Sequence, residues 1–375
     1  IGQYASGQGW GSAAGKFAGK ASLESTGVSL GALGGYIEFK FDDGITDDPT
    51  NPYGVDFVVY GNAFNGNPEA GAVQVSEDGT TWYELAGSKY YDGGFSFDGN
   101  KATGGKYSNV YTGTLRDTTV NYTKGSDIQV TLGGNGPKTF TTATAWWPTV
   151  DEYADSVIAA AHQDSNVTVS RTANQLTFGG VTAVQDSNTT AEYAFGYADV
   201  TPNGSPATYG DAVNPYTPYT SGKTGGDGFD LSWAVKADGT PIALSSVRYV
   251  RVYSAVLFSA GVFGETSAEV CGLYVANAES SSVGTTAAPA ITLADGPIPL
   301  DMATSMGNNV FYIPAETFEG AFTSGVVVTA TASSSTAKVF INGESTGTFT
   351  IQDASRGVQI LVQDGNSAPF ILVIK

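Results

Sequence analysis

The chain has 375 residues, and its 36 acidic residues exceed its 17 basic ones, which gives a formal net charge of −19. This charge disfavours binding to nucleic acid or to an anionic membrane, because both attract basic surfaces. The single cysteine excludes an intrachain disulfide, and with a single histidine it also disfavours a zinc site.

The first part of the chain reads as short strands separated by glycine-containing turns. The turn Asp78-Gly79 lies between two runs rich in β-branched and aromatic residues, which is typical of an antiparallel hairpin. An acidic loop is expected over residues 42–49. The predicted strands of this part are Tyr36–Phe41, Val55–Tyr60, Ala72–Ser76 and Trp82–Leu85.

The middle of the chain, residues 87–228, gives weaker strand patterns. Thr149 followed by Asp151 and Glu152 is typical of a helix N-terminus, so one helix is predicted near residues 150–163. Residues 199–228 are rich in Pro, Gly, Tyr and Asn and predict a long loop, a type of segment that often carries function. The predicted strands of the middle part are Tyr107–Thr112, Asp127–Thr131, Val167–Val169 and Gln175–Phe178.

Strong strand patterns return at Val247–Ser254 and Val270–Ala276, with a turn at Asp238-Gly239. Because hairpin patterns lie near both ends of residues 1–277, we expect the early and late strands to meet in one large β-sandwich. Residues 278–288 are mainly small and are expected to link this domain to a second one.

Residues 289–375 predict a second, smaller β-sandwich, so the expected fold class of the whole chain is all-β. The dipeptides Asn342-Gly343 and Asp364-Gly365 are typical of hairpin turns. The predicted strands of this unit are Val310–Ile313, Gly325–Ala332, Ala337–Ile341, Gly347–Ile351, Gly357–Val362 and Phe370–Ile374.

Three runs of the first domain resemble galactose-binding-like jelly rolls, the discoidin and carbohydrate-binding-module type. AVQVSEDGTTWYEL is similar to a strand–turn–strand of that fold, and RYVRVYSA with GETSAEVCGLYV is similar to its last strands. The resemblance implies an elaborated jelly-roll sandwich. It also implies a structural Ca²⁺ held by a glutamate near the last strand, which corresponds to Glu269.

Further runs resemble bacterial surface proteins. GGYIEFKF, YGNAFNG, WYELAGS and FDLSWAV are similar to an uncharacterised family from gut bacteria, and KVFINGESTGTFTIQ resembles the cadherin-like sandwich repeat, a spacer unit. The resemblance implies a secreted, cell-surface-attached protein whose targeting and anchoring segments lie outside these residues. No run approaches the roughly 20 apolar residues of a membrane-spanning helix.

Carboxylates are the candidate metal ligands, because Ca²⁺ takes six to eight oxygen ligands. Asp227 and Asp230, in a glycine-rich turn, are further oxygen donors. No segment has the spacing of an EF-hand loop, and a solvated acidic turn remains the alternative interpretation. The predicted ligands of a structural Ca²⁺ are Asp42, Asp43, Asp47, Asp48 and Glu269.

Aromatic residues are the candidate ligand-binding residues, because their rings stack on sugar faces or contact proteins. The alternative is that these rings pack beneath their own loops. The predicted binding residues are Trp146, Trp147, Tyr209, Tyr216 and Tyr219.

The predicted function is adhesion by a monomer to a glycan or a host extracellular protein, through loops of the first domain. One alternative is capture of a small molecule such as a corrinoid, which an enclosed apolar pocket would favour. Another is glycan hydrolysis, which needs two facing carboxylates, and Asp151 and Glu152 are the best placed for it. The sequence contains no HExxH or P-loop motif, so we expect binding rather than catalysis.

Overall fold

The computed structural model describes residues 27–30, 36–63, 68–91, 193–218, 223–254, 267–276 and 283–375, together with the backbone of short strands between residues 96 and 257. The described chain is all-β, as the sequence predicts, and its helices are single 3₁₀ turns. In this part of the chain no helix is long and apolar enough to cross a membrane. The predicted helix near residues 150–163 and the predicted strand Val167–Val169 lie outside the described residues. The 3₁₀ turns are η1 (Pro52–Gly54), η4 (Pro206–Thr208), η5 (Leu231–Trp233), η7 (Leu300–Met302), η8 (Ala315–Phe318) and η9 (Ala354–Arg356).

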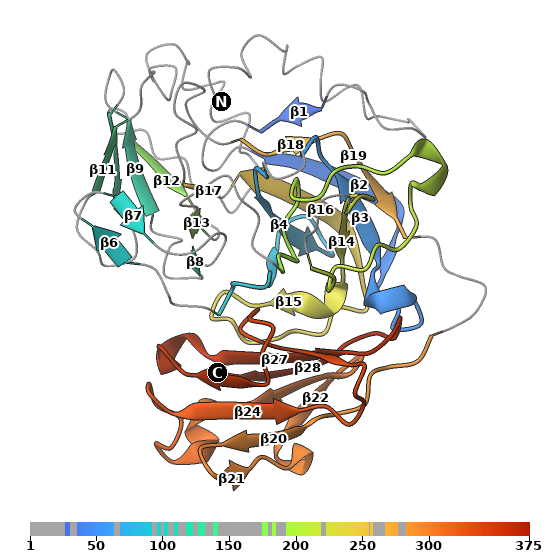
Figure 1. Cartoon of the computed structure of the whole chain (residues 1–375). Helices are drawn as coiled ribbons and strands as arrows, with labels where there is room; N and C mark the ends of the chain where they lie inside the picture. Colours follow the sequence, from blue (N-terminus) through green and yellow to red (C-terminus); the bar gives the residue numbers. More distant parts are fainter. Residues whose placement is uncertain are drawn as a thin grey trace.

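The N-terminal sandwich is built from strands at both ends of its sequence. Its strands are β1 (Val28–Ser29), β2 (Tyr36–Thr46), β3 (Phe57–Tyr60), β4 (Gly71–Ser76), β5 (Tyr83–Leu85), β14 (Asp227–Phe229), β15 (Ala234–Val235), β16 (Ser246–Ser254), β18 (Glu269–Val270) and β19 (Gly272–Val275). They form a sheet in the order β15-β5-β4-β16-β2, a sheet in the order β14-β3-β19 and the pair β1-β18 (Figure 1). Since β2 and β4 both pair with β16, the prediction that early and late strands meet is confirmed.

β16 lies at the centre of the larger sheet and is buried on both faces over its second half. Successive side chains of a strand point to opposite faces, and Val250 and Val252 belong to the apolar core. Arg251, on the other face, lies between the rings of Tyr36 and Trp82, with Cζ 4.9 and 3.8 Å from the ring centroids. A charged residue is therefore accommodated in the middle of a buried strand.

The strand predicted at Tyr36–Phe41 is longer in the structure, where it forms β2. β2 continues through residues 42–46, which the sequence analysis assigned to an acidic loop. Two features permit this extension: Gly44 has a φ of +76°, and the register against β16 shifts between Val247 and Tyr249. Asp42 and Asp43 therefore lie on a strand at the edge of the sheet, with exposed side chains.

The residues inserted between β5 and β14 form smaller sheets beside the N-terminal sandwich (Figure 1). Their strands are β6 (Ser96–Asp98), β7 (Lys101–Thr103), β8 (Asn109–Tyr111), β9 (Thr118–Tyr122), β10 (Asp127–Thr131), β11 (Lys138–Thr141), β12 (Gln175–Phe178) and β13 (Thr182–Val184). The sheet orders are β11-β10-β9-β12, β6-β7 and β17-β13-β8, the last of which includes β17 (Val256–Leu257). The strands predicted at Asp127–Thr131 and Gln175–Phe178 are confirmed.

The C-terminal sandwich has two sheets around its own core of Ile, Leu, Val and Phe side chains. Its strands are β20 (Ala290–Leu293), β21 (Gly296–Pro297), β22 (Thr304–Gly307), β23 (Val310–Ile313), β24 (Val327–Thr331), β25 (Lys338–Ile341), β26 (Thr348–Thr350), β27 (Val358–Gln363) and β28 (Phe370–Ile374). The sheet orders are β21-β20-β24-β26 and β22-β23-β28-β27-β25. The predicted strands from Val310 onward are confirmed within two residues, and Asn342 and Gly343 have the positive φ of a hairpin turn.

The two sandwiches pack directly against each other, with β27 and β28 lying next to β15 (Figure 1). Phe340 and Leu361 of the C-terminal sandwich are buried in the same apolar cluster as the core of the N-terminal one. The ring of Phe340 lies 5.8 Å from that of Phe195, and Lys338 Nζ donates to the carbonyl of Tyr216 at 3.0 Å. The C-terminal sandwich therefore contributes side chains to the core of its neighbour.

Candidate functional site

Three acidic side chains from distant parts of the N-terminal sandwich meet in one cluster, which we call the Asp199 trio. It consists of Glu69, Asp199 and Glu269, and one carboxylate oxygen of each lies within 4.8 Å of the others. Glu69 precedes β4, and an antiparallel bridge between Gly71 and Ala198 brings Asp199 beside it. Glu269 begins β18. The pairing of separate backbone segments therefore assembles the cluster.

The backbone is shaped around the carboxylate of Asp199. This residue has a φ of +59° and is fully buried. Its Oδ1 accepts a hydrogen bond from the backbone N–H of Asn62 at 2.8 Å, and its Oδ2 accepts one from that of Glu269 at 2.9 Å. A Cβ on Gly61 would overlap Oδ1 of Asp199, so only glycine fits there. Residues other than glycine rarely adopt a positive φ such as that of Asp199, and such backbone strain is concentrated at functional sites.

Burial and mutual repulsion make it unfavourable for all three carboxyls to be ionised. Burial, helped by the neighbouring charges of Glu69 and Asp227, raises the pKa of Asp199 to about 8. Burial and the charges of Asp199 and Glu69 raise the pKa of Glu269 to about 10, and burial raises that of Glu69. Glu69 and Glu269 are joined by a side-chain hydrogen bond, which requires a shared proton. A cation that displaced these protons would therefore find three converging oxygens.

The trio fits a Ca²⁺ ion by its chemistry. Its donors are all oxygens, and Ca²⁺ lies about 2.3–2.6 Å from each ligand, so ligands on opposite sides of it are about 5 Å apart. The spacing within 4.8 Å satisfies this limit. Glu69, Asp199 and Glu269 would hold the ion. Its positive charge would neutralise the carboxylates, which bound protons neutralise when no ion is present.

No protein-family model and no curated protein matches the chain. The roles of these residues are therefore argued from their geometry.

The other predicted metal ligands do not belong to the Asp199 trio. Asp47 joins a second cluster, with Asp56 and Asp230. Asp48 accepts hydrogen bonds from the backbone and hydroxyl of Thr50, at 2.9 and 2.7 Å, and belongs to neither cluster. Asp42 and Asp43 are exposed on β2 and also belong to neither cluster, so they do not share one acidic loop with Asp47 and Asp48.

Tyr216 does not belong to an exposed aromatic surface. Its side chain is fully buried, its ring lies 5.3 Å from that of Phe195, and its hydroxyl accepts a hydrogen bond from Trp233 Nε1 at 3.2 Å. Tyr209 is half-buried and lies in a group of tilted rings, 4.9 Å from Tyr60 and 5.9 Å from Tyr274. The remaining predicted binding residues, Trp146, Trp147 and Tyr219, lie outside the described residues.

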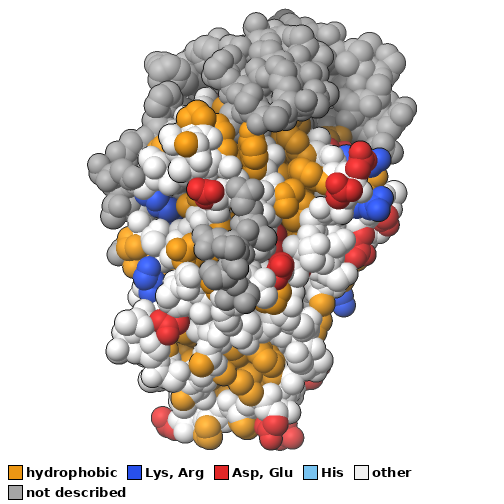
Figure 2. Space-filling model, turned by 90° about the vertical axis from the view of Figure 1, so that its right-hand side faces the viewer, with side chains coloured by type: hydrophobic (Ala, Val, Ile, Leu, Met, Phe, Trp, Pro, Cys, Tyr) orange, Lys and Arg blue, Asp and Glu red, His pale blue; other side chains and the backbone are white. Residues whose placement is uncertain are grey.

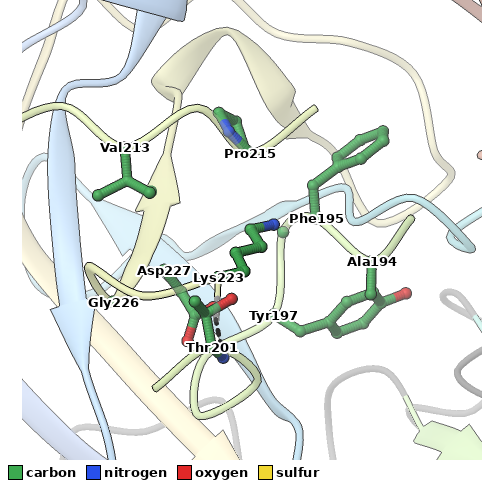
Figure 3. Close-up of a pocket in the computed structure, with 11 residues that line it drawn as sticks. Ala194, Phe195, Tyr197, Thr201, Val213, Pro215, Lys223, Gly226 and Asp227 are labelled. Carbon is green, nitrogen blue, oxygen red and sulfur yellow. Dashed lines mark hydrogen bonds between the residues drawn. The ribbon is translucent and has the colours of Figure 1, made fainter. Parts of the chain in front are cut away.

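A small pocket opens beside the segment that carries Asp199 (Figure 3). It encloses about 230 Å³ of empty space, part of it open to solvent. In Figure 3 the side chain of Lys223 extends toward Phe195, and Asp227 lies next to Thr201. Burial raises the pKa of Asp227 to about 7 and lowers that of Lys223, while the charges of the two groups oppose these shifts. The pocket can take a small polar group.

Charged side chains are scattered over the described part of the face in Figure 2, where acidic and basic groups lie singly or in small groups. Hydrophobic side chains gather on the lower part of this view, over the C-terminal sandwich. On the described part of this face the basic side chains form no large cluster.

Sequence reasoning missed Glu69, Asp199 and Asp56 as ligand candidates. Glu69 and Asp199 stand alone in their sequence neighbourhoods, and the residues of the trio are separated by 70 or more positions. No metal-binding spacing therefore links them. One signal was present for Glu69, because it closely follows the run YGNAFNG, whose first glycine, Gly61, contacts Asp199.

Proposed function

We propose that the protein is a secreted bacterial surface protein that binds a glycan or a host extracellular protein through loops of its N-terminal, jelly-roll-type sandwich. In this proposal a Ca²⁺ held by the Asp199 trio orders those loops without touching the ligand. The observation that carries the proposal is the convergence of three buried carboxylates where the segments around Asn62, Asp199 and β18 meet. Calcium sites of extracellular modules work at the high calcium levels outside cells.

The structure supports a connection between the trio and the loop that follows it. Asn203 Nδ2 donates to the carbonyl of Gly61 at 2.6 Å, and Gly61 lies against Asp199. The hydroxyl of Tyr60 accepts a hydrogen bond from the backbone N–H of Gly210 at 2.9 Å. These contacts fasten both ends of residues 203–210. The half-buried ring of Tyr209 lies within this segment and offers part of an aromatic surface for a sugar or a protein side chain.

The test is a binding screen of the full chain against a glycan array and a panel of matrix proteins, in Ca²⁺ and in EDTA. We expect binding in Ca²⁺ that is lost in EDTA and in Asp199→Asn. The matched control is Glu77→Gln, an exposed acid in the β4–β5 turn, which should bind like the wild type. Binding that survives EDTA would overturn the calcium part alone. The absence of binding in every condition would overturn the proposed recognition.

The alternatives gain less support from the described residues. A drug-sized ligand occupies about 300–1,000 Å³, and the pocket near Lys223 is much smaller than this, because its empty space of about 230 Å³ includes open solvent. This volume does not favour a corrinoid, which is larger still. Glycan hydrolysis needs carboxylates that flank an accessible bond. The Asp199 trio does not meet this need because the side chain of Asp199 is fully buried. Asp151 and Glu152 lie outside the described residues.

A further inference from the structure

A second cluster of carboxylates, the Asp230 trio, lies at the junction of the two sandwiches. It consists of Asp47, Asp56 and Asp230, with one carboxylate oxygen of each within 4.8 Å of the others. Asp47 directly follows β2, Asp56 directly precedes β3, and Asp230 caps η5, where its Oδ1 accepts from the backbone N–H of Ser232 at 2.7 Å. Three separate segments therefore bring their carboxylates together in one cluster.

Asp56 is held rigidly within this cluster. Its Oδ1 accepts hydrogen bonds from the backbone N–H of Asp48 at 3.0 Å and from Asn51 Nδ2 at 3.1 Å. Its Oδ2 accepts one from the backbone N–H of Leu231 at 2.9 Å. Such backbone donors fix the orientation of a carboxylate and favour its charged form. The cluster thus has a preformed geometry.

One buried oxygen of the trio has no hydrogen-bond partner in the part of the chain that the structure describes. Asp230 is 1% exposed, and its Oδ2 has no hydrogen-bond donor among the described residues. A buried oxygen without a partner is costly and calls for an explanation such as an ion. Gly54 lies against this oxygen, has a φ of +74°, and would place a Cβ 2.5 Å from Oδ2. The backbone therefore leaves room beside Oδ2 that a larger residue would fill.

The charge of the trio is not balanced by a cationic side chain among the described residues. Among the described residues, the charged groups that act on Asp56 and Asp230 are other carboxyls, and together with burial they raise the pKa of both. The ion pairs of the described residues, Lys89 with Glu344 and Arg251 with Glu38, do not include any member of the trio. Within the described part of the chain, Oδ2 of Asp230 accepts no hydrogen bond that could offset its charge. Burying several carboxylates without a cation is strongly unfavourable.

The segments that carry the Asp230 trio also contact the C-terminal sandwich. Asn308 Nδ2 donates to the backbone carbonyl of Asp47 at 3.3 Å. The backbone N–H of Tyr53, in η1, donates to the carbonyl of Asn366 at 2.8 Å. An ion that fixed Asp47 and Asp56 would therefore also fix the residues that receive the second sandwich.

We propose that the Asp230 trio binds a divalent cation, Ca²⁺, and that this ion stabilises the junction between the two sandwiches. The all-oxygen donor set and the burial favour Ca²⁺ over softer metals. The site is separate from the Asp199 trio, and its presence does not depend on the proposed glycan recognition.

The first test counts ions on the full chain by native mass spectrometry after equilibration with Ca²⁺. We expect Asp230→Asn to hold one ion fewer than the wild type. We expect the same loss in Asp47→Asn, a milder change because Asp47 is only half-buried. Asp42→Asn is the matched control, an exposed acid on β2, the strand that Asp47 follows, and should keep the wild-type count. Wild-type ion counts in both Asp230→Asn and Asp47→Asn would overturn the proposal.

Two further readouts keep the test decisive if one variant folds poorly. Tb³⁺ in place of Ca²⁺ should emit on tryptophan excitation, because Trp233 lies in the 3₁₀ turn that Asp230 caps. This emission should be absent in Asp47→Asn and present in Asp199→Asn, which separates this site from the Asp199 trio. Hydrogen exchange at Asp48, Leu231 and Tyr53 should slow about a hundredfold when Ca²⁺ exceeds its Kd about a hundredfold. Equal exchange in Ca²⁺ and in EDTA would contradict the proposal.

Discussion

The backbone N–H of Glu269 donates a 2.9 Å hydrogen bond to Oδ2 of Asp199, although 70 residues separate the two acids. This bond, together with that from Asn62, orients the carboxylate of Asp199 before any ion arrives. A preformed group of acids must then hold either protons or a cation, since burial makes three charges in one place unfavourable. The choice between protons and a cation depends on pH.

The first prediction is that the metal-free protein loses stability as the pH rises from about 5 to 9. The folded-state pKa is raised to about 8 for Asp199, about 7 for Asp227 and about 10 for Glu269. The stability that each group contributes is fully present below its unfolded pKa and is lost as the pH rises through its folded pKa. Each unit of pKa difference corresponds to about 1.4 kcal/mol of unfolding free energy.

The measurement is the Tm in EDTA across this pH range, repeated in Ca²⁺. We expect the Tm in EDTA to fall with rising pH and the increase caused by Ca²⁺ to grow, because the ion replaces protons. Asp78 and Asp364 have lowered pKa values, owing to hydrogen bonds that their carboxylates accept, so their contributions change only at more acidic pH. A Tm in EDTA that is constant or rises from pH 5 to 9 would contradict the pKa shifts.

The second prediction concerns Gly61→Ala. The added Cβ would overlap Oδ1 of Asp199, so either the backbone or the carboxylate must move. We expect a cost of about 1–3 kcal/mol in the free energy of unfolding, together with a smaller increase in Tm on adding Ca²⁺. Gly284→Ala is the control, because a Cβ there meets no atom within 4 Å. If the two variants responded equally to Ca²⁺, Gly61 would have no role in shaping the trio.

The third prediction compares two glycines of the C-terminal sandwich that both have positive φ. Gly365→Ala meets no neighbour and should cost about 1–2 kcal/mol, the price of the left-handed conformation. Gly343→Ala should cost several times more, because its Cβ would overlap the backbone carbonyl of Ser88 in the other sandwich. Urea unfolding measures both costs. Equal costs would show that the contact between Gly343 and Ser88 is looser than described.

The fourth prediction separates a core role from a binding role for Tyr216. Tyr216→Phe removes the acceptor of the Trp233 Nε1–H bond and leaves that donor buried. We expect a loss of about 1–3 kcal/mol in the free energy of unfolding, with unchanged affinity for any ligand found in the binding screen. Loss of ligand affinity with full stability would instead place Tyr216 in the binding site.

Most strands of the fold could be predicted because their residues carry the necessary information locally. β16 and β28 are rich in β-branched and aromatic residues, and Asp78-Gly79 and Asn342-Gly343 supply turns. The acidic end of β2 was mistaken for a loop for a physical reason. An exposed edge strand tolerates charge, so Asp42 and Asp43 carry no signal against strand structure.

The candidate sites could be predicted only in part, because their residues meet through tertiary pairing. Glu269 was found through a resemblance and Asp47 through local acidity, whereas Asp56 and Asp199 depend on contacts that their own neighbourhoods do not reveal. The junction was missed for a similar reason. Phe340 and Leu361 read as core residues of their own strands, and nothing local indicates that they serve the neighbouring core.

The pairing of β2 with β16 has a consequence for biosynthesis. In the described part of the chain β2 forms its ladder with β16 alone, and about 200 residues separate the two strands. At a synthesis rate of about 5–20 residues per second, β2 therefore waits about 10–40 seconds for its partner. During that interval its exposed edge can pair with other chains. The acids at the end of β2 would then oppose aggregation of the nascent chain by charge repulsion.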